Sequence, residues 1–578
     1  MIYLLVTLLA TVGFAGIVKF ACKGELVDIA IGIISVLVLA GSFISLYFIM
    51  PVLAYNKPSI YVMVGLIWIM GLIFAAAFDG DDIKITSLFI GLIIYVIIGG
   101  VSVIYTWNLF HAHGKQKMLQ PTEIVIEATD SIVAATDINN LCTISPEVAE
   151  KAILVKMGDL KNTYEVGNLT KQSASCDFEA TLADGKKMHI KYNNLIIYVG
   201  VLEHRSFWTW RKTKFSPAYV IADASDADKV YVITEDNSEP LKIRYTQGAS
   251  FNYNFERHMR QNGYLSKILA DFDVEIDYNG RPCAPVTTMK NTIGCSTPVV
   301  TGVAVVDLQT GEINQYTPEN APEFVNMIQP ADVIYDRINW WGDYVYGYFH
   351  WSEKSGLTQA CEGMDVVQTP NGCFYYVGIR AQTDSVGTQG YMLIDTRTGK
   401  ATYYKRTGIS EAEAIRVLKA NTDLNLEMNS GVLKLTEPIF YNIEGLPTYF
   451  ATYVSTNDYM VKYYGMCSTS DKSVWGYGKT LEEARKNYLN SYYKNESDKV
   501  VKFSDKHEIE YVEVKVLEKS NINEVFYFRF EGYEDKVFVG TLSEQMSDML
   551  WSSQKVRISF NDNTNSKFVT LNSYEIII

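Results

Sequence analysis

Histidine is scarce in this chain of 578 residues, and the residue patterns of the common enzyme classes are missing. Of the seven histidines only His111 and His113 lie close together, and no cysteine or aspartate beside them completes a zinc site. The sequence has no GxxxxGK(S/T) loop, no GxSxG elbow, no HExxH motif and no GxGxxG loop after a strand. We therefore expect a protein that is not an enzyme, with no catalytic residue, no metal and no cofactor.

Closely spaced cysteines are missing too. Seven of the eight cysteines follow residue 114, an odd number without the spacing of a disulfide framework. Buried free thiols, which behave as small apolar groups, are the favoured interpretation. Cys283 with Cys295, and Cys361 with Cys373, could instead form disulfides if this region lay outside the cell.

Positive charge is in deficit, with 51 Lys and Arg against 65 Asp and Glu and a net charge of −14. A surface that binds nucleic acid needs the opposite balance. We therefore expect no nucleic acid partner, because an acidic balance favours solubility and protein partners.

The first 110 residues contain only nine charged side chains and four long apolar runs. The runs are Ile2–Cys22, Ile29–Leu53, Ser59–Phe78 and Ile85–Trp107. Each is close to the ~20 residues that a helix needs to cross the hydrocarbon core of a bilayer. The sequence therefore predicts an integral membrane protein with a four-helix transmembrane anchor at 1–114. Its first run lacks the charged start and the small-residue cleavage site of a signal peptide, so an uncleaved helix is favoured.

Lysines near the ends of these runs decide which side of the membrane the rest of the chain occupies. Three lie on each side: Lys19, Lys23 and Lys84 against Lys57, Lys115 and Lys117. The count is a tie, and the favoured arrangement has the soluble body in the cytoplasm, on a bacterial inner or plasma membrane.

Small residues recur at helical spacing within the runs and allow helices to approach closely. They are Gly13, Gly16, Gly41, Ser45, Gly71 and Ala75. They predict either packing within one chain or contact between subunits of a homo-oligomer.

The hydrophobic period changes after residue 114 to short alternating strands separated by a few helices. One pattern, two apolar residues followed by Asp-x-x-Thr-Gly, occurs at Val305–Glu312 and again at Ile394–Lys400. Asp307 and Asp395 are expected to cap their own turns, and the glycine to take the positive φ that closes a hairpin. This predicts an α+β body of antiparallel hairpin and helix units, with a first unit in 115–275 and tandem units in 276–499.

The last segment, 500–578, predicts five strands with a helix between the third and the fourth. The strands are Glu508–Lys519, Val525–Glu531, Lys536–Thr541, Lys555–Phe560 and Lys567–Ile578, and the helix is Leu542–Trp551. This order is typical of a small OB-like or SH3-like β-barrel. Its acidic balance favours a barrel that contacts protein.

These repeated strand–Asp-x-x-Thr-Gly–strand units with an adjoining helix resemble the hairpin module of PepSY-type domains, which are small non-catalytic inhibitory or binding modules. The whole chain also resembles an uncharacterised family of bacterial, and large-phage, multi-span membrane proteins. The segments that carry this second resemblance are Leu195–Phe207, Trp340–Trp351 and Tyr441–Met466. The resemblance implies the architecture and no activity.

Two aromatic stretches are candidate sites. The first combines cations with tryptophan at Arg205, Trp208, Trp210, Arg211, Lys212 and Lys214. It predicts a membrane-interface contact, since tryptophan favours the interface and cations attract anionic headgroups. The alternatives are a strand and loop with buried tryptophan, and stacking on single-stranded bases.

The second stretch is rich in Trp and Tyr at Trp340, Trp341, Tyr344, Tyr346, Tyr348 and Trp351. Such density predicts a protein interface, a packed core or a stacked ligand.

Together these features favour a non-enzymatic, membrane-anchored scaffolding protein that acts through oligomerisation and protein contacts. A channel or transport subunit with a soluble vestibule, and a membrane-bound hydrolase or peptidase regulator, are the alternatives.

Overall fold

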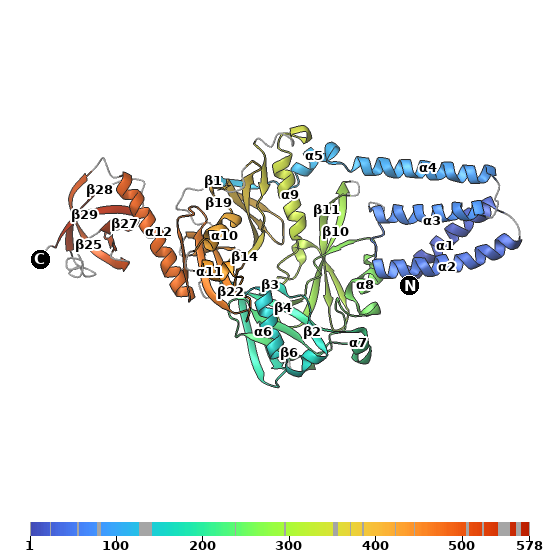
Figure 1. Ribbon diagram of the computed structural model, residues 1–578, viewed down its shortest axis with the longest axis horizontal. Helices are drawn as coiled ribbons and strands as arrows, with labels where there is room; N and C mark the ends of the chain where they lie inside the picture. The colour runs from blue at the N-terminus through green and yellow to red at the C-terminus, as the bar shows by residue number, and fades with distance from the viewer. Residues whose placement is uncertain are drawn as a thin grey trace. The chain divides into compact units, whose positions relative to one another are not determined.

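The computed structural model divides the chain into two compact units, Met1–Thr407 and Gly408–Ile578 (Figure 1). It describes residues 2–22, 25–54, 57–77, 82–125, 141–236, 239–293, 296–350, 356–369, 372–383, 387–421, 424–443, 446–503, 508–522, 525–540, 555–561 and 568–576. Within them Cys22 and six of the seven cysteines after residue 114 are free and buried, as expected for those six, and Cys295 lies outside the described residues. The division into four domains stays a prediction.

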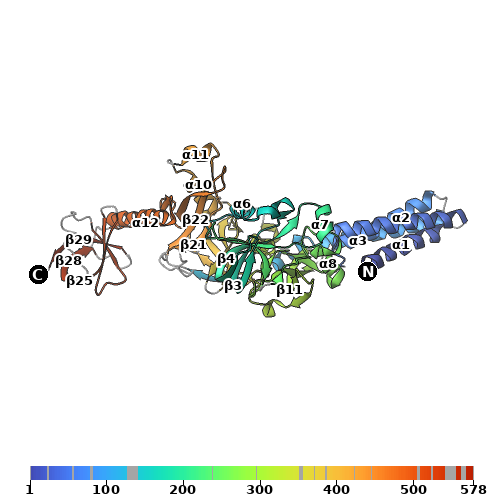
Figure 2. The same ribbon diagram turned by 90° about the horizontal axis from the view of Figure 1, so that it is seen from below.

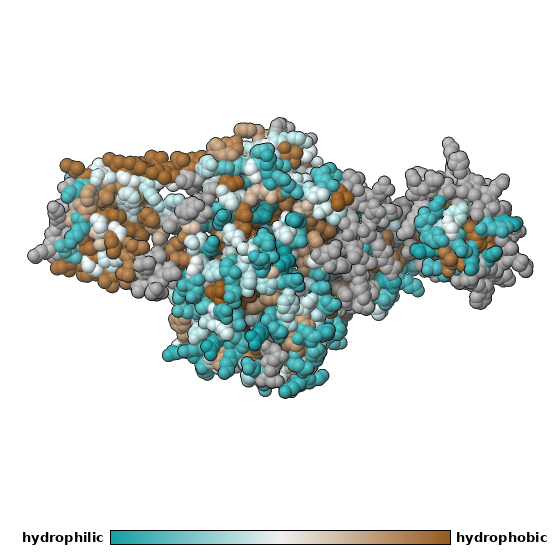
Figure 3. All heavy atoms as spheres, turned by 180° about the vertical axis from the view of Figure 1, so that it is seen from behind, coloured by the Kyte–Doolittle hydropathy of each residue, from teal (hydrophilic) through white to brown (hydrophobic). Residues whose placement is uncertain are grey.

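Four apolar helices begin the first unit: α1 (Ile2–Ala21), α2 (Glu25–Ile49), α3 (Pro58–Ala77) and α4 (Asp82–Tyr105). Phe14 and Val18 of α1 are buried against α2 and α3, where Phe74 meets Phe14 edge-on at 5.9 Å. Figure 3 shows the outer surface of these helices as largely apolar.

The prediction of four membrane-spanning helices is wrong. Among the described residues two helical segments are long and apolar enough to cross a membrane, Asp28–Ile49 and Asp82–Val101, and the same test is met by core helices and signal sequences. The shorter apolar segments are Thr7–Phe20 and Tyr61–Ala77. Hydropathy predicted four spans because it does not distinguish a helix that crosses a membrane from one that packs on other helices, as α1 does through the buried Phe14 and Val18.

The rest of the first unit is α+β, and this part of the predicted fold class is confirmed. The first sheet has six strands in the order β2-β4-β3-β6-β5, and β7 pairs with β6. The second has five strands in the order β12-β11-β10-β8, and β9 pairs with β10. The third has six strands in the order β1-β18-β17-β15-β13, and β14 pairs with β15. The bounds in the first sheet are β2 (Tyr164–Val166), β3 (Thr170–Leu182), β4 (Lys187–His204), β5 (Tyr219–Asp223), β6 (Val230–Asp236) and β7 (Glu239–Pro240). In the second they are β8 (Ile268–Ala270), β9 (Glu275–Ile276), β10 (Pro282–Ile293), β11 (Ser296–Asp307) and β12 (Ile313–Tyr316). In the third they are β1 (Thr122–Val125), β13 (Thr358–Ala360), β14 (Asp365–Thr369), β15 (Gly372–Ala381), β17 (Gly390–Asp395) and β18 (Ala401–Lys405).

The two Asp-x-x-Thr-Gly sequences form equivalent turns between antiparallel strands. Asp307 Oδ1 accepts hydrogen bonds from the backbone N–H of residues 309 and 310, at 2.8 and 2.9 Å. Asp395 Oδ1 accepts them from residues 397 and 398, at 2.9 and 2.7 Å. Gly311 and Gly399 take φ of 78° and 72°, so both aspartates are turn caps, as predicted.

In the described part of the first unit five further helices follow α4: α5 (Asn108–Gln116), α6 (Pro146–Lys156), α7 (Phe207–Thr213), α8 (Phe255–Met259) and α9 (Ala331–Asp343). The Ser145 side chain caps α6, with Pro146 at its first position. In place of the strand and loop that was one alternative for the basic aromatic stretch, the chain forms α7. The Trp340–Trp341 pair likewise lies on a helix, α9.

The second unit contains a five-stranded sheet, β20-β22-β23-β24 with β21 on β22, and a closed barrel, β25-β26-β27-β29-β28. Its sheet strands are β20 (Leu433–Leu435), β21 (Ile439–Ile443), β22 (Leu446–Ser455), β23 (Val461–Ser468) and β24 (Trp475–Gly478), with helices α10 (Glu411–Lys419), α11 (Asn425–Asn429) and α12 (Leu481–Phe503). Its barrel strands are β25 (Glu508–Ile522), β26 (Val525–Phe530), β27 (Val537–Gly540), β28 (Lys555–Asn561) and β29 (Phe568–Ile576). The helix expected at 542–551 lies outside the described residues.

Candidate membrane interface and acidic junction

Helix α7 is short and is fixed at both ends by local hydrogen bonds. The Ser206 side chain accepts from the Thr209 N–H at 3.3 Å, and the Thr209 hydroxyl oxygen accepts from the Ser206 N–H at 3.2 Å. This reciprocal pair is a capping box. Lys214 ends the helix with φ of 60°, and its N–H donates to the Trp210 carbonyl at 2.7 Å. The sequence therefore determines where α7 begins and ends.

Aromatic rings gather on α7. Trp210 is buried, whereas Phe207 and Trp208 are 41% and 67% exposed. Phe207 stacks on Trp210 at 5.9 Å and meets Trp208 edge-on at 5.4 Å. Phe251, 54% exposed, lies 5.9 Å from Phe207. Large rings that are exposed and packed on one another form an apolar patch, which is typical of an interaction site.

Three cations, Arg211, Lys212 and Lys214, are exposed beside these rings. We call these three, with Phe207, Trp208 and Phe251, the α7 surface. Arg205 has another role, because its Nε donates to two backbone carbonyls, those of Lys161 at 2.9 Å and Tyr164 at 3.1 Å. It fixes the loop before α7.

A buried arginine connects this surface to the end of α2. Arg257 Nη1 donates to the Phe251 carbonyl at 2.7 Å, and its Nε donates to the Tyr47 carbonyl at 3.2 Å. The guanidinium also lies over the Tyr47 ring, 4.0 Å from the ring centroid. The Leu53 N–H adds a bond to the Leu265 carbonyl at 3.0 Å. The α7 surface is therefore fixed next to the end of an apolar helix, and Figures 1 and 2 show α8 beside that end.

The end of α4 meets the body in a similar way. Trp107 and Phe110 are exposed where α4 turns into α5. Lys115 of α5 is buried, donates to Asn108 Oδ1 at 2.7 Å and lies 4.5 Å from the centroid of the Trp340 ring. Burial lowers the pKa of this lysine. A second group of exposed rings thus lies at the body end of an apolar helix.

The predicted protein-interface residues separate into buried and exposed members. Trp341 meets Tyr403 edge-on at 5.4 Å inside the third sheet's core, and Tyr344 is buried. Tyr348 stacks on Tyr344 at 6.4 Å, and Tyr346 is exposed. Trp351 lies outside the described residues. An interface through this stretch stays a prediction.

The small residues of the apolar helices divide in the same way. A Cβ on Gly71 would lie 2.7 Å from Ile17 Cγ2, and Ala75 is fully buried, so this edge of α3 contacts α1 closely. A Cβ on Gly13, Gly16 or Gly41 would meet nothing within 4 Å. For Ser45 the structure describes the backbone alone. Gly91, whose Cβ would lie 2.9 Å from the Trp68 ring, is a close contact that sequence reasoning missed.

A second candidate site is a set of three carboxylates in the segment that runs from the end of β8 to the first residue of β9. Asp271, Asp273 and Glu275 alternate along this segment, and we call them the acidic junction. The Thr170 hydroxyl of β3 donates to Asp273 Oδ1 at 3.4 Å. Gln172, also of β3, pairs with the Ile276 backbone through two bonds of 2.9 and 3.0 Å. The acidic junction therefore lies where the second sheet contacts the first.

Burial dominates the electrostatics of the acidic junction. It raises the pKa of Asp271 to about 7, with further contributions from Asp273 and Asp332. It raises the pKa of Glu275 well above the usual range, although Arg397 acts in the opposite direction. Glu275 is 1% exposed, and its Oε2 has no hydrogen-bond partner in the described part of the chain. These carboxyl groups can hold protons near neutral pH.

Metal binding is a different matter. No group of three His, Cys, Asp or Glu side chains among the described residues is arranged to hold a metal ion. Sequence reasoning missed the acidic junction, although three acidic residues spaced as Asp-x-Asp-x-Glu at 271–275 were a visible signal.

Comparison with known proteins assigns no family. No family model matches this chain, and no curated protein matches it. Among solved structures, a B. megaterium levansucrase mutant aligns over 78% of this chain and 98% of its own, at 7% identity and a TM-score of 0.18. The resemblances to PepSY modules and to multi-span bacterial proteins stay predictions.

Proposed function

We propose that this chain is a non-enzymatic scaffolding protein held at a membrane, with its body fixed on the lipid through the α7 surface. The observation that carries the proposal is the Arg257 contact, which joins the end of α2 to the ring cluster of the α7 surface. Anionic headgroups would meet the three cations, and the exposed rings would enter the interface.

The exposure of the apolar helices supports this proposal. In the most apolar 18-residue stretch of Asp28–Ile49 18% of the residues are buried, and in that of Asp82–Val101 no residue is fully buried. In a soluble protein such helices would present a large apolar surface to water. Lipid is the solvent in which this surface costs least, so α2 and α4 are the proposed spans.

Carbonate extraction of membranes that contain the full chain tests the membrane association. We expect the chain to stay in the pellet, because carbonate removes proteins held by charge alone. Release of the intact chain into the supernatant would contradict the proposal.

Hydrogen exchange of the full chain in vesicles tests the role of the α7 surface. Exchange at 207–214 should be slower in anionic than in zwitterionic vesicles, since each cation contributes about 1 kcal/mol at an anionic surface. The triple variant Arg211→Gln, Lys212→Gln, Lys214→Gln should abolish the difference. Lys186→Gln with Lys187→Gln, on the exposed β3–β4 turn, is the matched control and should leave it unchanged. Equal exchange in both vesicles for the unmodified chain would show that α7 does not touch lipid.

A further inference from the structure

Exposed aromatic rings lie around the point where α4 enters the body. Tyr105 ends α4, and Trp107 and Phe110 follow where the chain turns into α5; each of these rings is more than half exposed. Phe349, also exposed, lies on the short helix Tyr348–His350, which contacts α5. We call these four residues the α5 surface. Exposed rings gathered in this way are typical of an interaction site.

Hydrogen bonds fix the turn that carries these rings. His111 Nε2 donates to the Tyr105 carbonyl at 2.7 Å, and the two rings meet edge-on at 4.7 Å. This bond satisfies a carbonyl that the end of α4 would otherwise leave without a helical partner. The Trp107 N–H donates to the Ile104 carbonyl at 3.0 Å, and the Phe110 N–H donates to the Trp107 carbonyl at 3.1 Å. The local sequence therefore ends α4 at Tyr105 and turns the chain there.

The length of α4 gives the α5 surface a definite depth in a bilayer. At 1.5 Å per residue, the 24 residues of α4 measure about 36 Å, more than the ~30 Å hydrocarbon core and less than the ~40–45 Å of core and headgroups together. With α4 as a span, Tyr105 therefore falls in the headgroup layer, and Trp107 follows within about 7 Å of chain. Tyr and Trp are the residues enriched at this depth.

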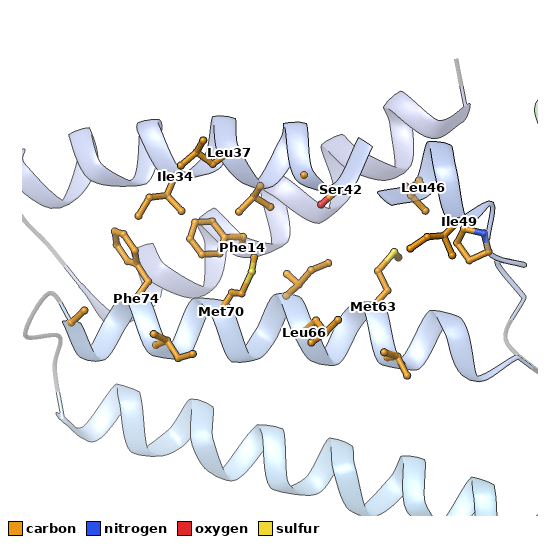
Figure 4. Close-up of a pocket in the computed structure, with 17 residues that line it drawn as sticks. Phe14, Ile34, Leu37, Ser42, Leu46, Ile49, Met63, Leu66, Met70 and Phe74 are labelled. Atoms are coloured by element: carbon orange, nitrogen blue, oxygen red, sulfur yellow. The ribbon is translucent and has the colours of Figure 1, made fainter. Parts of the chain in front are cut away.

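The α5 surface is separate from the apolar groove between the other helices. That groove is lined mainly by α2 and α3, with Phe14 of α1 (Figure 4), and no residue of the α5 surface is among those that line it. The α5 surface also differs in charge from the α7 surface, because it contains no charged side chain and the α7 surface contains three cations. It therefore fits the boundary between acyl chains and headgroups whatever the headgroup charge.

We propose that the α5 surface is a second contact of the body with the lipid headgroup region, an inference that rests on the membrane association proposed above. The α7 surface lies next to the end of α2 and the α5 surface at the end of α4, so both proposed spans end in exposed rings on the body side (Figure 1). The bilayer holds the body at two places, by charge and rings at one and by rings alone at the other. The short chain distance from α4 favours lipid over a second copy as the occupant, because a surface this close to a span lies at headgroup depth in every copy.

Spin labelling of the full chain in phosphatidylcholine vesicles tests this contact. A nitroxide at Phe110→Cys reports collisions with oxygen, which concentrates in lipid, and with a nickel chelate, which stays in water. The ratio of oxygen to nickel collisions should be at least about threefold higher than at the control Val155→Cys, an exposed apolar position on α6. The described cysteines are buried, and Cys295 is replaced by serine in both variants. Added anionic lipid should leave the ratio unchanged, because the α5 surface carries no charge.

Equal ratios at the two labelled positions would overturn the proposal. Phe349→Cys should repeat the high ratio, and it serves if Phe110→Cys fails to fold. Spin–spin broadening at residue 110 that disappears on dilution with unlabelled chain would identify a second copy as the occupant, and the lipid contact would fail. The carbonate pellet reports membrane association separately, so a chain that stays in the pellet with a low ratio at residue 110 contradicts the α5 contact alone.

Discussion

At the scale of single residues, the two Asp-x-x-Thr-Gly turns are alike in geometry and differ in what depends on them. Arg397, in the second turn, donates from Nη1 to the Pro322 carbonyl at 2.9 Å and from Nη2 to the Ala321 carbonyl at 2.8 Å. It also donates to the Val325 carbonyl. The second turn therefore positions a side chain that ties down the 321–325 loop.

This difference predicts unequal costs for the same substitution. Asp307→Ala should destabilise the first unit by about 1 kcal/mol, the usual effect of losing such a cap. Asp395→Ala should cost roughly 2–3 kcal/mol, because Arg397 loses its fixed backbone as well. Urea unfolding of both variants measures the difference. Equal losses would mean that Arg397 holds the loop without help from the turn.

At the scale of elements, the acidic junction makes the contact between sheets depend on pH. Asp332 of α9, Arg397 of the β17–β18 turn and Thr170 of β3 face these carboxyls. One cation stands against four carboxyl groups in this set. The contact between the sheets is thus more stable when the carboxyls carry protons.

Asp271→Asn tests this dependence. Because the pKa of Asp271 is raised in the folded protein to about 7, its contribution to stability is fully present below pH ~4 and is lost as pH rises through ~7. The variant should therefore have a higher Tm than the unmodified protein at pH 8, by a few degrees, and an equal one at pH 4. Asparagine suits this position, since residue 271 has φ of 54°.

Asp177→Asn is the control of opposite sign. A hydrogen bond from Lys191 lowers the pKa of this exposed aspartate, so its contribution is present above pH ~4 and is lost at lower pH. Asp177→Asn should not raise the Tm at pH 8. If both variants raised it, general charge reduction and not the acidic junction would be the cause.

The elements that the sequence predicted are those whose signal is local. The turns capped by Asp307 and Asp395 depend on residues within four positions. The sequence did not predict helix α7, because the segment that forms it has only seven residues and lies between two strands. The Arg257 contact was also out of reach, since its partners Tyr47 and Phe251 are 210 and 6 residues away and no pattern links them.

At the scale of the whole molecule, the apolar runs led to a wrong number of membrane-spanning helices. Hydropathy does not distinguish a helix that crosses a membrane from one that packs against other helices. Segment Thr7–Phe20 is mostly apolar, yet Phe14 and Val18 are buried against neighbouring helices. The α+β body and its hairpins were predictable, since alternation and turn residues report strand ends. The sequence did not predict which sheets contact one another, because this depends on contacts such as the one between Gln172 and Ile276, which are 104 residues apart.

The two compact units have separate apolar cores, and this predicts separate stabilities. Phe530 of β26 is fully buried in the barrel, 5.9 Å from Phe528 and 4.9 Å from Phe538. Phe530→Ala should destabilise the barrel by about 3–5 kcal/mol through the cavity it leaves. Leu517→Ala, at an exposed position of β25, should cost far less.

Pulse proteolysis of the full chain, read by mass spectrometry, follows both units in one experiment. Because no described core cluster includes residues of both units, peptides from Met1–Thr407 should keep their unfolding midpoint in Phe530→Ala. Peptides from the barrel should become cleavable at lower denaturant. A parallel fall in the first unit would mean that the two units fold as one cooperative body.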